Sequence, residues 1–406
     1  MRVLKWISWG LAGLFVLILL GLGVLVWVVD PNAFKGRIEA AVQEATGREF
    51  TLAGDIELKF FPWLALRTGA GEFGNPPGFP REPMASWQHA RLGVRVVPLM
   101  RGELEVDRIM LEGADVRLTR RADGKGNWEG IGGEAQDQPD AKNRHVTVDG
   151  VDLRDSRLSF VDETAARRVE ISALNLTTGA IDPGRPFTGT TIAGVAHMQG
   201  FAPGGVPFRL AVPEAALTED YSKLDVPDFS ASLGAMEAQG AVRGSFGGAV
   251  RLEGSIDTNT FDARALLASL GVAAPRTTDP ATLTRIDLAS AWKFDAGAIS
   301  IDPLALQLDD THFTGNFHRA AGDDPVGEFT LRGDRLDIAR YVPVTDPKSP
   351  PFVLPTAELR ALKFRGVLEL AQATYDDVEM KGVTLRLLLD EQGLRSQSPP
   401  KTAAVK

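Results

Sequence analysis

The chain has 406 residues, 44% of them apolar, with a formal net charge of −9 and no cysteine. The acidic balance argues against a nucleic-acid partner, because phosphate binding needs a basic surface that releases counterions. The lack of cysteine excludes disulfides, thiolate metal sites and a cysteine nucleophile.

The N-terminus predicts a membrane anchor. Arg2 and Lys5 precede an uncharged stretch from Trp6 to Val29, which as a helix would span roughly 35 Å and cross a hydrocarbon core of about 30 Å. A cleaved signal peptide is the alternative, but it would have a shorter apolar region and a small-residue cleavage site. We therefore expect residues 1–29 to be a retained, single-pass anchor. The positive charges before the span predict a cytoplasmic N-terminus, with the bulk of the chain on the other side of the membrane.

A short amphipathic helix should follow the anchor. The stretch PNAFKGRIEAAVQEATG starts at Pro31, behind a possible capping Asp30, and ends at Gly47. Its apolar residues fall on one stripe. We expect this helix to cap the end of a sheet.

Residues 69–74 read GAGEFG and fit the spacing of a dinucleotide-binding loop. Such a loop needs a helix N-terminus directly after it to receive the pyrophosphate. Pro76, Pro77 and Pro80 remove backbone N–H groups at that place, so the nucleotide interpretation fails. We interpret the segment as a hairpin excursion at a sheet margin, in which glycines supply positive φ and prolines prevent edge pairing.

From Phe50 onward, short runs of alternating apolar and polar residues are separated by turn residues, which predicts a mainly β fold. In PLALQLDD, Leu304, Leu306 and Leu308 would lie on one face of a sheet, and Ala305 and Gln307 on the other. The same alternation elsewhere gives the candidate residues for an apolar groove: Val116, Leu118, Leu158, Phe160, Val169, Ile171, Leu304, Leu306, Leu308, Phe329, Leu331, Leu385 and Leu387.

Two helices should interrupt the strands, one at 261–271 that ends at a glycine and a marginal one at 336–342 before Pro343. Stretches rich in Gly, Pro and polar residues mark the joints between segments. The predicted segments are the anchor at 1–29, the helix and first β segment at 30–142, a second β segment at 143–345 containing the inserted helix at 261–271, terminal β hairpins at 346–395, and a disordered tail at 396–406.

No catalytic constellation is found in the sequence. The five histidines are scattered, and none has a partner at the helical spacing of a zinc site. The acidic pairs Asp309–Asp310 and Asp323–Asp324 are interpreted as solvated hairpin turns rather than calcium ligands. An enzyme with a diffuse site stays open as an alternative. We expect a protein that is not an enzyme and that has no cofactor and no metal.

Several blocks occur in order along the chain: DPNAFKGRIEAAVQEATGREFTLAGDIELKFFPWLAL, GNPPGF, VVPLMRGELEVDRIMLEGADVRL, DGKGNW, FDARALLASLG, LQLDDTHFTGNF and GDRLDIARYVP. Together with the N-terminal span, they resemble the AsmA family of inner-membrane-anchored envelope proteins, which is related to bridge-like lipid-transfer proteins. Family members usually continue past the KGVTLRLLLDEQGLR block into more strands, so we expect a short or truncated member. The positions that carry the resemblance mark the fold and are not catalytic: Gly54, Pro62, Gly74, Asn75, Pro76, Phe79, Pro98, Leu99, Gly102, Gly126, Asn127 and Trp128.

The resemblance implies a transmembrane helix followed by an elongated, curled antiparallel β-sheet groove with a few short capping helices. It also implies a protein of the cell inner membrane, mostly periplasmic, that binds or conducts phospholipid along an apolar groove in outer-membrane biogenesis. The alternative is a non-enzymatic assembly factor for outer-membrane proteins, whose sheet edges would pair with nascent strands. The expected partners are membrane phospholipid and other envelope or outer-membrane proteins, with no nucleic acid.

Overall fold

The computed structural model describes residues 31–59, 63–95, 104–130, 146–182, 184–198, 201–322, 325–344, 363–390 and 393–396. The predicted anchor at 1–29 and all but the first residue of the predicted tail lie outside these ranges. Within them, no helix has both the length and the apolar character needed to cross a membrane.

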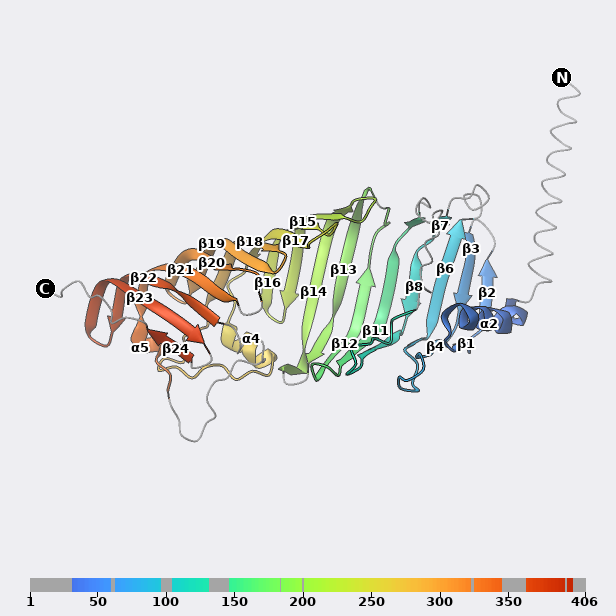
Figure 1. Ribbon diagram of the computed structural model, residues 1–406, viewed down its shortest axis with the longest axis horizontal. Coiled ribbons are helices and arrows are strands. Elements are labelled where there is room, and N and C mark those ends of the chain that lie inside the picture. Colours follow the sequence, from blue (N-terminus) through green and yellow to red (C-terminus); the bar gives the residue numbers. More distant parts are fainter. Residues whose placement is uncertain are drawn as a thin grey trace, which may run out of the picture. The chain divides into compact units, whose positions relative to one another are not determined.

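The chain forms two compact units, Met1–Ala166 (unit 1) and Arg167–Lys406 (unit 2). Each consists mainly of β-strands, as the alternating sequence predicts, and each is an open, curved sheet with short helices beside it (Figure 1). The predicted boundary between the first and second β segments, after residue 142, lies outside the described residues.

Unit 1 contains the following elements: η1 (Pro31–Phe34), α2 (Lys35–Thr46), β1 (Phe50–Leu52), β2 (Ile56–Lys59), β3 (Trp63–Thr68), β4 (Gly71–Phe73), β5 (Ala85–Trp87), β6 (His89–Arg95), β7 (Leu104–Val106), β8 (Ile109–Glu112), β9 (Asp115–Arg120), β10 (Val146–Val148) and β11 (Val151–Asp162). Strands β7, β8 and β9 run parallel to β10 and β11. Two antiparallel groups of strands pair with the free edges of β7, β8 and β9. In the first group, β2–β3–β6, strand β6 pairs with β7 and β8; in the second, β1–β4–β5, strand β5 pairs with β9.

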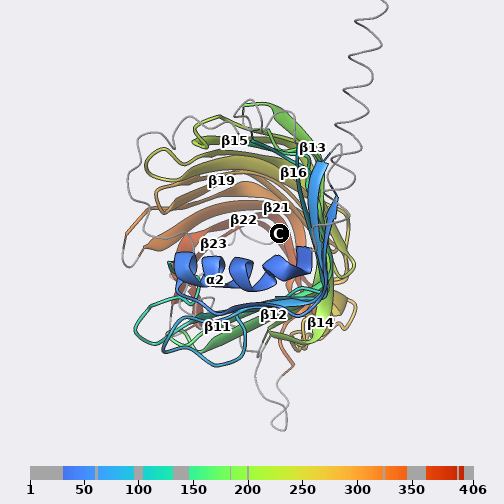
Figure 2. The same ribbon diagram turned by 90° about the vertical axis from the view of Figure 1, so that its right-hand side faces the viewer.

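The predicted capping helix is present as α2, and it lies across the end of the unit 1 sheet (Figure 2). It ends at Gly47, whose φ of 67° is left-handed. Glu39 Oε1 accepts a hydrogen bond from Leu52 N at 2.8 Å, and Asn32 Oδ1 accepts one from Ile56 N at 2.9 Å. These side chains satisfy backbone donors of β1 and β2 that would otherwise form an exposed edge.

The GAGEFG segment corrects one expectation. Residues Gly71–Phe73 form β4, which pairs with β1 and with β5. Among the glycines at 69–78, only Gly78 has a positive φ, so the expectation of left-handed glycines is wrong for the other three. Gly69 and Gly71 are instead required by close approach: a Cβ on Gly69 would lie 2.8 Å from Gly54 Cα, and one on Gly71 would overlap the ring of Trp87.

Unit 2 contains the following elements: β12 (Arg167–Thr177), β13 (Pro186–Met198), β14 (Phe201–Leu217), β15 (Lys223–Leu233), β16 (Met236–Ser245), β17 (Arg251–Thr258), α4 (Ala263–Ser269), β18 (Ile286–Asp295), β19 (Ala298–Leu308), β20 (Thr311–Arg319), β21 (Val326–Asp337), α5 (Ile338–Tyr341), β22 (Lys363–Tyr375), β23 (Val378–Asp390) and β24 (Gly393–Ser396). Successive strands from β12 to β21 are antiparallel neighbours, and so are β22, β23 and β24.

The parallel pairs depart from the expected antiparallel sheet. In unit 2, β21 and β22 are parallel. Between them in the sequence lie α5 and residues 342–362, and β22 begins at the margin where β21 began. A connection of this length is what a parallel pair needs. The alternation of apolar and polar residues is the same in both arrangements, so it could not distinguish them.

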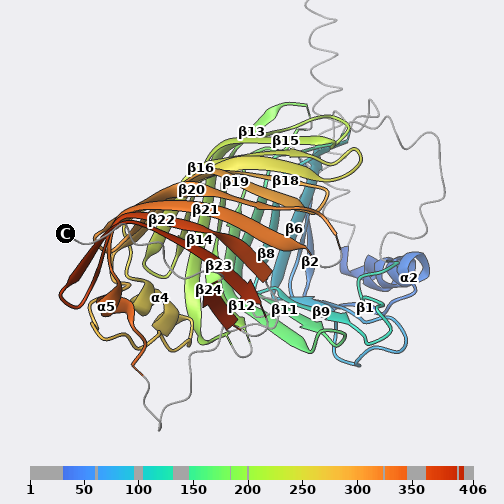
Figure 3. The same ribbon diagram turned by 60° about the vertical axis from the view of Figure 1, so that its left-hand side comes forward.

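The strands of unit 2 bend, and α4 and α5 lie on the side toward which they bend (Figure 3). Asp262 caps α4 by accepting a hydrogen bond from Ala265 N. The α4 residues Leu266 and Leu267, with Leu270 just after them, pack against Ala202 and Val206 of β14. Ile338 of α5 packs with a second buried cluster, formed by Phe313, Leu370, Ala373 and Val383.

Candidate functional site

The registers of unit 2 bring alternate residues of neighbouring strands into rows on one face. Directly opposite residues of paired strands share a face. One row runs Leu288, Leu306, Phe313, Gly333, Leu370, Val383; the next runs Leu304, Gly315, Leu331, Leu368, Leu385; a third runs Trp292, Ile301, Phe317, Phe329, Gly366, Leu387. Apart from Ser290 of β18, which lies opposite Leu304, these rows are apolar from β18 to β23. The side of unit 2 that carries them is called the apolar face below.

Nine of the predicted groove residues belong to unit 2. The rows contain Leu304, Leu306, Phe329, Leu331, Leu385 and Leu387, and Leu308 packs beside them. Val169 and Ile171 lie on β12 opposite Met198 and Ala196, and Ala196 packs with the cluster beneath α4.

The other four predicted residues belong to unit 1. Val116 lies opposite Leu158, and Leu118 lies opposite Phe160. The ring of Phe160 is 6.0 Å from the ring of Trp128. Unit 1 therefore has its own apolar patch at β9 and β11, and the DGKGNW segment covers part of it.

A β-bulge on β19 keeps Ile301 and Leu304 on the same face of the sheet. Ile301 pairs with Phe317 and Leu304 pairs with Gly315, so residues three apart lie on one face. Strict alternation through residues 302 and 303 would have turned one of them toward the opposite face. The sequence pattern of PLALQLDD predicted the face of Leu304 but not that of Ile301.

Aromatic rings lie over glycines of adjacent strands on the apolar face. A Cβ on Gly254 would be 2.8 Å from the ring of Trp292, and one on Gly366 would be 2.5 Å from the ring of Phe329. A Cβ on Gly333 would be 2.7 Å from the ring of Phe313. A ring placed over a glycine occupies the space that a side chain would fill there, and it covers the backbone.

The two faces of unit 2 differ in exposure. Along β17, residues Leu252, Gly254 and Ile256 are half-buried, whereas Arg251 and Glu253 between them are exposed. Within the described residues, the clusters that contain α4 and α5 each cover only a part of the apolar face. Most of its side chains are thus left partly accessible in a continuous apolar path.

The opposite face of unit 2 is polar and carries ion pairs between neighbouring strands. Arg332 Nε lies 2.9 Å from Glu369 Oε2, and Arg365 Nε lies 3.0 Å from Glu328 Oε1. The Arg365 guanidinium lowers the pKa of the Glu328 carboxyl. These side chains are about half-exposed, so each pair contributes little to stability.

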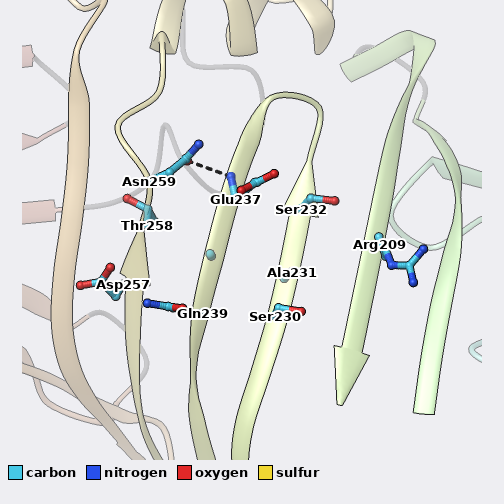
Figure 4. Close-up of a pocket in the computed structure, with 10 residues that line it drawn as sticks. Arg209, Ser230, Ala231, Ser232, Glu237, Gln239, Asp257, Thr258 and Asn259 are labelled. Carbon is cyan, nitrogen blue, oxygen red and sulfur yellow. Dashed lines mark hydrogen bonds between the residues drawn. The ribbon is translucent and has the colours of Figure 1, made fainter. Parts of the chain in front are cut away.

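A shallow pocket of about 430 Å³ also lies on the polar face. Its lining includes Arg209, Glu237, Gln239 and Asp257, and Asn259 accepts a hydrogen bond from the backbone of Glu237 (Figure 4). Most of the lining side chains are polar or charged, and they come from β14 to β17 and from Asn259 just after β17. We interpret the pocket as a hydrated depression between side chains.

One serine–histidine pair was missed by the sequence analysis. Ser172 Oγ lies 3.1 Å from His197 Nε2, on neighbouring strands of the polar face. A nucleophile and base at this distance could begin acyl transfer, but the reaction also needs donors that stabilise an oxyanion. Ser172 lies opposite Val195 at the last regular position before a bulge on β12, and no oxyanion-stabilising donor is assigned beside it among the described residues. The pair is interpreted as a hydrogen bond between strands.

Asp309 corrects another expectation, because it is buried rather than solvated. Its exposed fraction is 2%. Its carboxylate accepts hydrogen bonds from Leu283 N at 2.7 Å, Thr284 N at 3.0 Å and Tyr341 Oη at 2.7 Å. Burial, together with Asp309, raises the pKa of the Tyr341 hydroxyl. The carboxylate joins the β19–β20 turn to the segment after α4 and to α5, which lie beside the apolar face. The other acidic pair, Asp323–Asp324, lies outside the described residues.

The family model described as "AsmA family" matches residues 1–200. Residues 1–200 belong to the AsmA family. The AsmA-family region thus includes all of unit 1 and the first strands of unit 2. It also contains the GNPPGF and DGKGNW segments, which unit 1 brings together: Asn75 Oδ1 accepts a hydrogen bond from Asn127 Nδ2 at 2.8 Å.

Protein AsmA of Escherichia coli (strain K12) is 29% identical to this chain over 106 residues. The aligned part is 26% of this chain and 17% of that protein, so it spans less than a fifth of the relative's length. No solved structure matches the chain significantly.

Proposed function

We propose that the apolar face of unit 2 binds the acyl chains of phospholipid. The observation that carries this proposal is the set of mainly apolar rows from β18 to β23. Outside the buried cluster that contains Phe313, Leu370 and Val383, most of their side chains are half-buried within the described residues. The same face continues to β12 through Ile171 and Ala196.

The physical reason is the cost of hydrating an acyl chain. Each buried CH₂ group contributes about 0.8 kcal/mol, so a sixteen-carbon chain loses on the order of 12 kcal/mol when it enters water. A continuous apolar surface offsets this cost at every position along the chain. The binding needs no reacting side chain, and the face supplies none. In this proposal the protein is a carrier or conduit and not an enzyme.

The rings over glycines give the face room for a ligand. If Trp292 and Phe329 stood away from the sheet, they would fill the space on its concave side. Their positions over Gly254 and Gly366 keep that space accessible to an acyl chain. Apolar surface that is left accessible in this way commonly marks a binding site.

We place the protein in the cell envelope, with residues 1–29 as an inner-membrane anchor and the units in the periplasm. The support is the uncharged run between Trp6 and Val29, the preceding Arg2 and Lys5, and membership of residues 1–200 in the AsmA family. An anchor of this kind would hold the apolar face near a source of phospholipid.

Native mass spectrometry of the full chain tests lipid binding. The wild-type chain should carry phospholipid through purification. Leu331→Arg places a cation between Gly315 and Leu368 on the apolar face and should lower lipid occupancy strongly. Thr314→Arg, on an exposed position of the polar face, should leave it unchanged. A lipid-free wild-type chain, or equal occupancy in both variants, would contradict the proposal.

One observation favours the second candidate, an assembly factor that adds strands of other proteins to its sheet. β24 pairs with β23 only over Leu387–Asp390, so Val378–Arg386 have no second neighbouring strand within the described residues. An edge of this length can accept an extended peptide. Crosslinks from this edge to envelope proteins, with no lipid on the purified chain, would favour this candidate.

A further inference from the structure

We infer that one margin of unit 2 docks onto a zwitterionic phospholipid surface through the turns at 218–222 and 246–250, which we call the rim. This interaction goes beyond the proposed lipid binding and does not depend on it. Strands β14 to β17 are consecutive antiparallel neighbours, so both turns fall at the same margin. Phe246 N donates a hydrogen bond to Ser222 O at 2.7 Å, which joins the two turns.

The rim exposes three large apolar side chains. Tyr221 is 60% exposed, Phe246 42% and Val250 41%. Val250 O accepts a hydrogen bond from Ala296 N at 3.0 Å, so the next turn along the margin adjoins the rim. Apolar and aromatic side chains at the tips of adjacent turns can enter the boundary between headgroups and acyl chains without disturbing the strands behind them. Tyrosine in particular suits this boundary, because its ring is apolar and its hydroxyl stays hydrated.

Tyr221 is held in a conformation that its residue type does not favour. Its φ is 57°, in the left-handed region that glycine and asparagine adopt most easily. The neighbouring Asp220 fixes the turn: Asp220 Oδ1 accepts hydrogen bonds from Thr218 Oγ1 at 2.6 Å and from Ser222 Oγ at 2.7 Å. The bond from Thr218, followed by those from Ser222, lowers the pKa of the Asp220 carboxyl to about 2, so these acceptors stay ionised at neutral pH. An ordered turn that exposes a large ring in a strained conformation suggests a role for the ring in contact.

The rim is continuous with the apolar face. The ring of Phe246 lies over Gly244, where a Cβ would be 2.8 Å from it, and Gly244 is paired with Leu252. Leu252 belongs to the half-buried side of β17, which also carries Gly254, and Gly254 lies opposite Trp292 of β18. A bilayer in contact with the rim would therefore adjoin the surface proposed for acyl chains.

The charges near the rim favour a lipid without net charge. Arg243 Nε lies 3.2 Å from Asp225 Oδ1, and Arg251 Nε lies 3.1 Å from Asp295 Oδ1. Both arginines are thus neutralised by carboxylates of the protein, and the rim has no cluster of free cations for anionic headgroups. Docking should then depend on buried apolar area and change little with salt.

The opposite margin differs and provides the control. It carries α5 and the turn between β22 and β23, because Asp337 at the start of α5 adjoins Thr374 at the end of β22. Tyr375 in that turn is 46% exposed, close to the value for Phe246. The proposal predicts that Tyr375 stays in water.

Site-specific fluorescence in the full chain tests the proposal, since the natural chain has no cysteine to remove. A polarity-sensitive dye is placed on Tyr221→Cys, Phe246→Cys or Tyr375→Cys, and each chain is reconstituted in phosphatidylcholine vesicles that contain spin-labelled lipid. Quenching should be several-fold stronger at 221 and 246 than at 375, and it should persist in high salt. Equal quenching at the three positions, or none at 221 and 246, would overturn the proposal. It would also be overturned if the dyes at the rim were shielded from water by a protein that can be crosslinked there.

Two further variants separate docking from acyl-chain binding. Phe246→Ser combined with Val250→Ser should abolish quenching of a dye at 221 while circular dichroism stays unchanged; undiminished quenching would contradict a shared rim. Leu306→Arg disturbs the apolar face and leaves the rim intact, so quenching at 221 should remain. Loss of quenching in Leu306→Arg would show that the contact at 221 depends on lipid in the groove and would refute an independent docking surface.

Discussion

Asn127 shows how a single buried polar side chain joins segments that are far apart in the sequence. It is fully buried. Its amide donates to Asn75 Oδ1 and, at 2.7 Å, to Arg117 O, and it accepts from Thr119 N at 2.9 Å. Arg48 Nη1 donates to Asn127 O at 2.7 Å, although burial lowers the pKa of that guanidinium. The sequence identified the Asn75 and Asn127 segments as marks of the fold, but it could not show that they meet.

Asn127→Ala should destabilise unit 1 by about 3 kcal/mol, because it leaves the Thr119 N–H and the Arg117 carbonyl buried without partners. Urea unfolding followed by circular dichroism would measure the change. Asn316→Ala, at an exposed position of the polar face, is the control and should stay within about 0.5 kcal/mol. If the two variants unfolded at the same urea concentration, the role assigned to Asn127 would be wrong.

Residue-scale expectations failed where tertiary contacts outweighed local preference. Asp309 follows a hairpin pattern that usually marks a solvated turn, yet backbone donors from residues 283 and 284 and the Tyr341 hydroxyl bury it. Gly69 and Gly71 were expected to allow positive φ, but they serve close approach to Gly54 and Trp87. Both causes lie in residues distant in sequence, so no local pattern could have revealed them.

At the scale of elements, an ion-pair network holds the segment after α4 against α5. Arg340 Nε lies 2.8 Å from Asp279 Oδ2, and Arg340 Nη1 lies 3.0 Å from Asp310 Oδ2. The pKa of Asp279 is lowered by the backbone N–H of Ala281 and then by Arg340, and the pKa of Asp310 is lowered mainly by Arg340. A carboxyl with a lowered pKa in the folded state stabilises that state at neutral pH and ceases to do so when it is protonated.

This network should therefore loosen in acid. Its contribution is present above about pH 4, the ordinary pKa of aspartate, and is lost as the pH falls through the lowered folded-state values. The anisotropy of a dye on Ala281→Cys should fall over that range, and Asp279→Asn should lower it already at neutral pH. Asp295→Asn, which removes the ion pair with Arg251 outside this segment, should leave the anisotropy at neutral pH unchanged. A dye signal that is independent of both pH and Asp279 would refute the network.

Gly254→Ala tests the pairing of rings with glycines. The added Cβ would meet the Ala241 carbonyl and lie 2.8 Å from the ring of Trp292. We expect a loss of about 1–3 kcal/mol in the free energy of unfolding, because neither the backbone nor the ring can move without disturbing the ladder. Gly248→Ala is the control, since a Cβ there meets nothing within 4 Å. Equal stability of the two variants, measured in urea, would show that the ring is free to move.

The sequence predicted most elements but not how all of them pair. The alternating runs became strands, and the helix expected at 261–271 is α4 at Ala263–Ser269. The marginal helix at 336–342 is α5, Ile338–Tyr341. The period of two fixes which face a side chain takes, so Leu304, Leu306 and Leu308 could be assigned to one surface. It carries no information on strand direction or bulges, which is why the parallel β21–β22 pair and the phase of Ile301 were not predicted.

For the whole molecule, the proposed topology has a direct test. A reporter that is active only outside the cytoplasm, fused after Gly393, should be active, because Arg2 and Lys5 precede the uncharged run. The chain recovered from membranes should still begin at its first residues. A mature form that starts near Asp30 would contradict the retained anchor and would remove the proposed attachment to the inner membrane.

The central claim is that the apolar face of unit 2 holds acyl chains, and photo-crosslinking at two adjacent residues of β19 tests it most directly. Leu306 lies between Leu288 and Phe313 on the apolar face, whereas Ala305 lies exposed on the polar face between Ala289 and Thr314. The pleat alone separates the two side chains. A photoreactive residue at 306 should capture phospholipid in cells and one at 305 should capture little. Equal capture at both positions, or capture of protein alone at 306, would contradict the account.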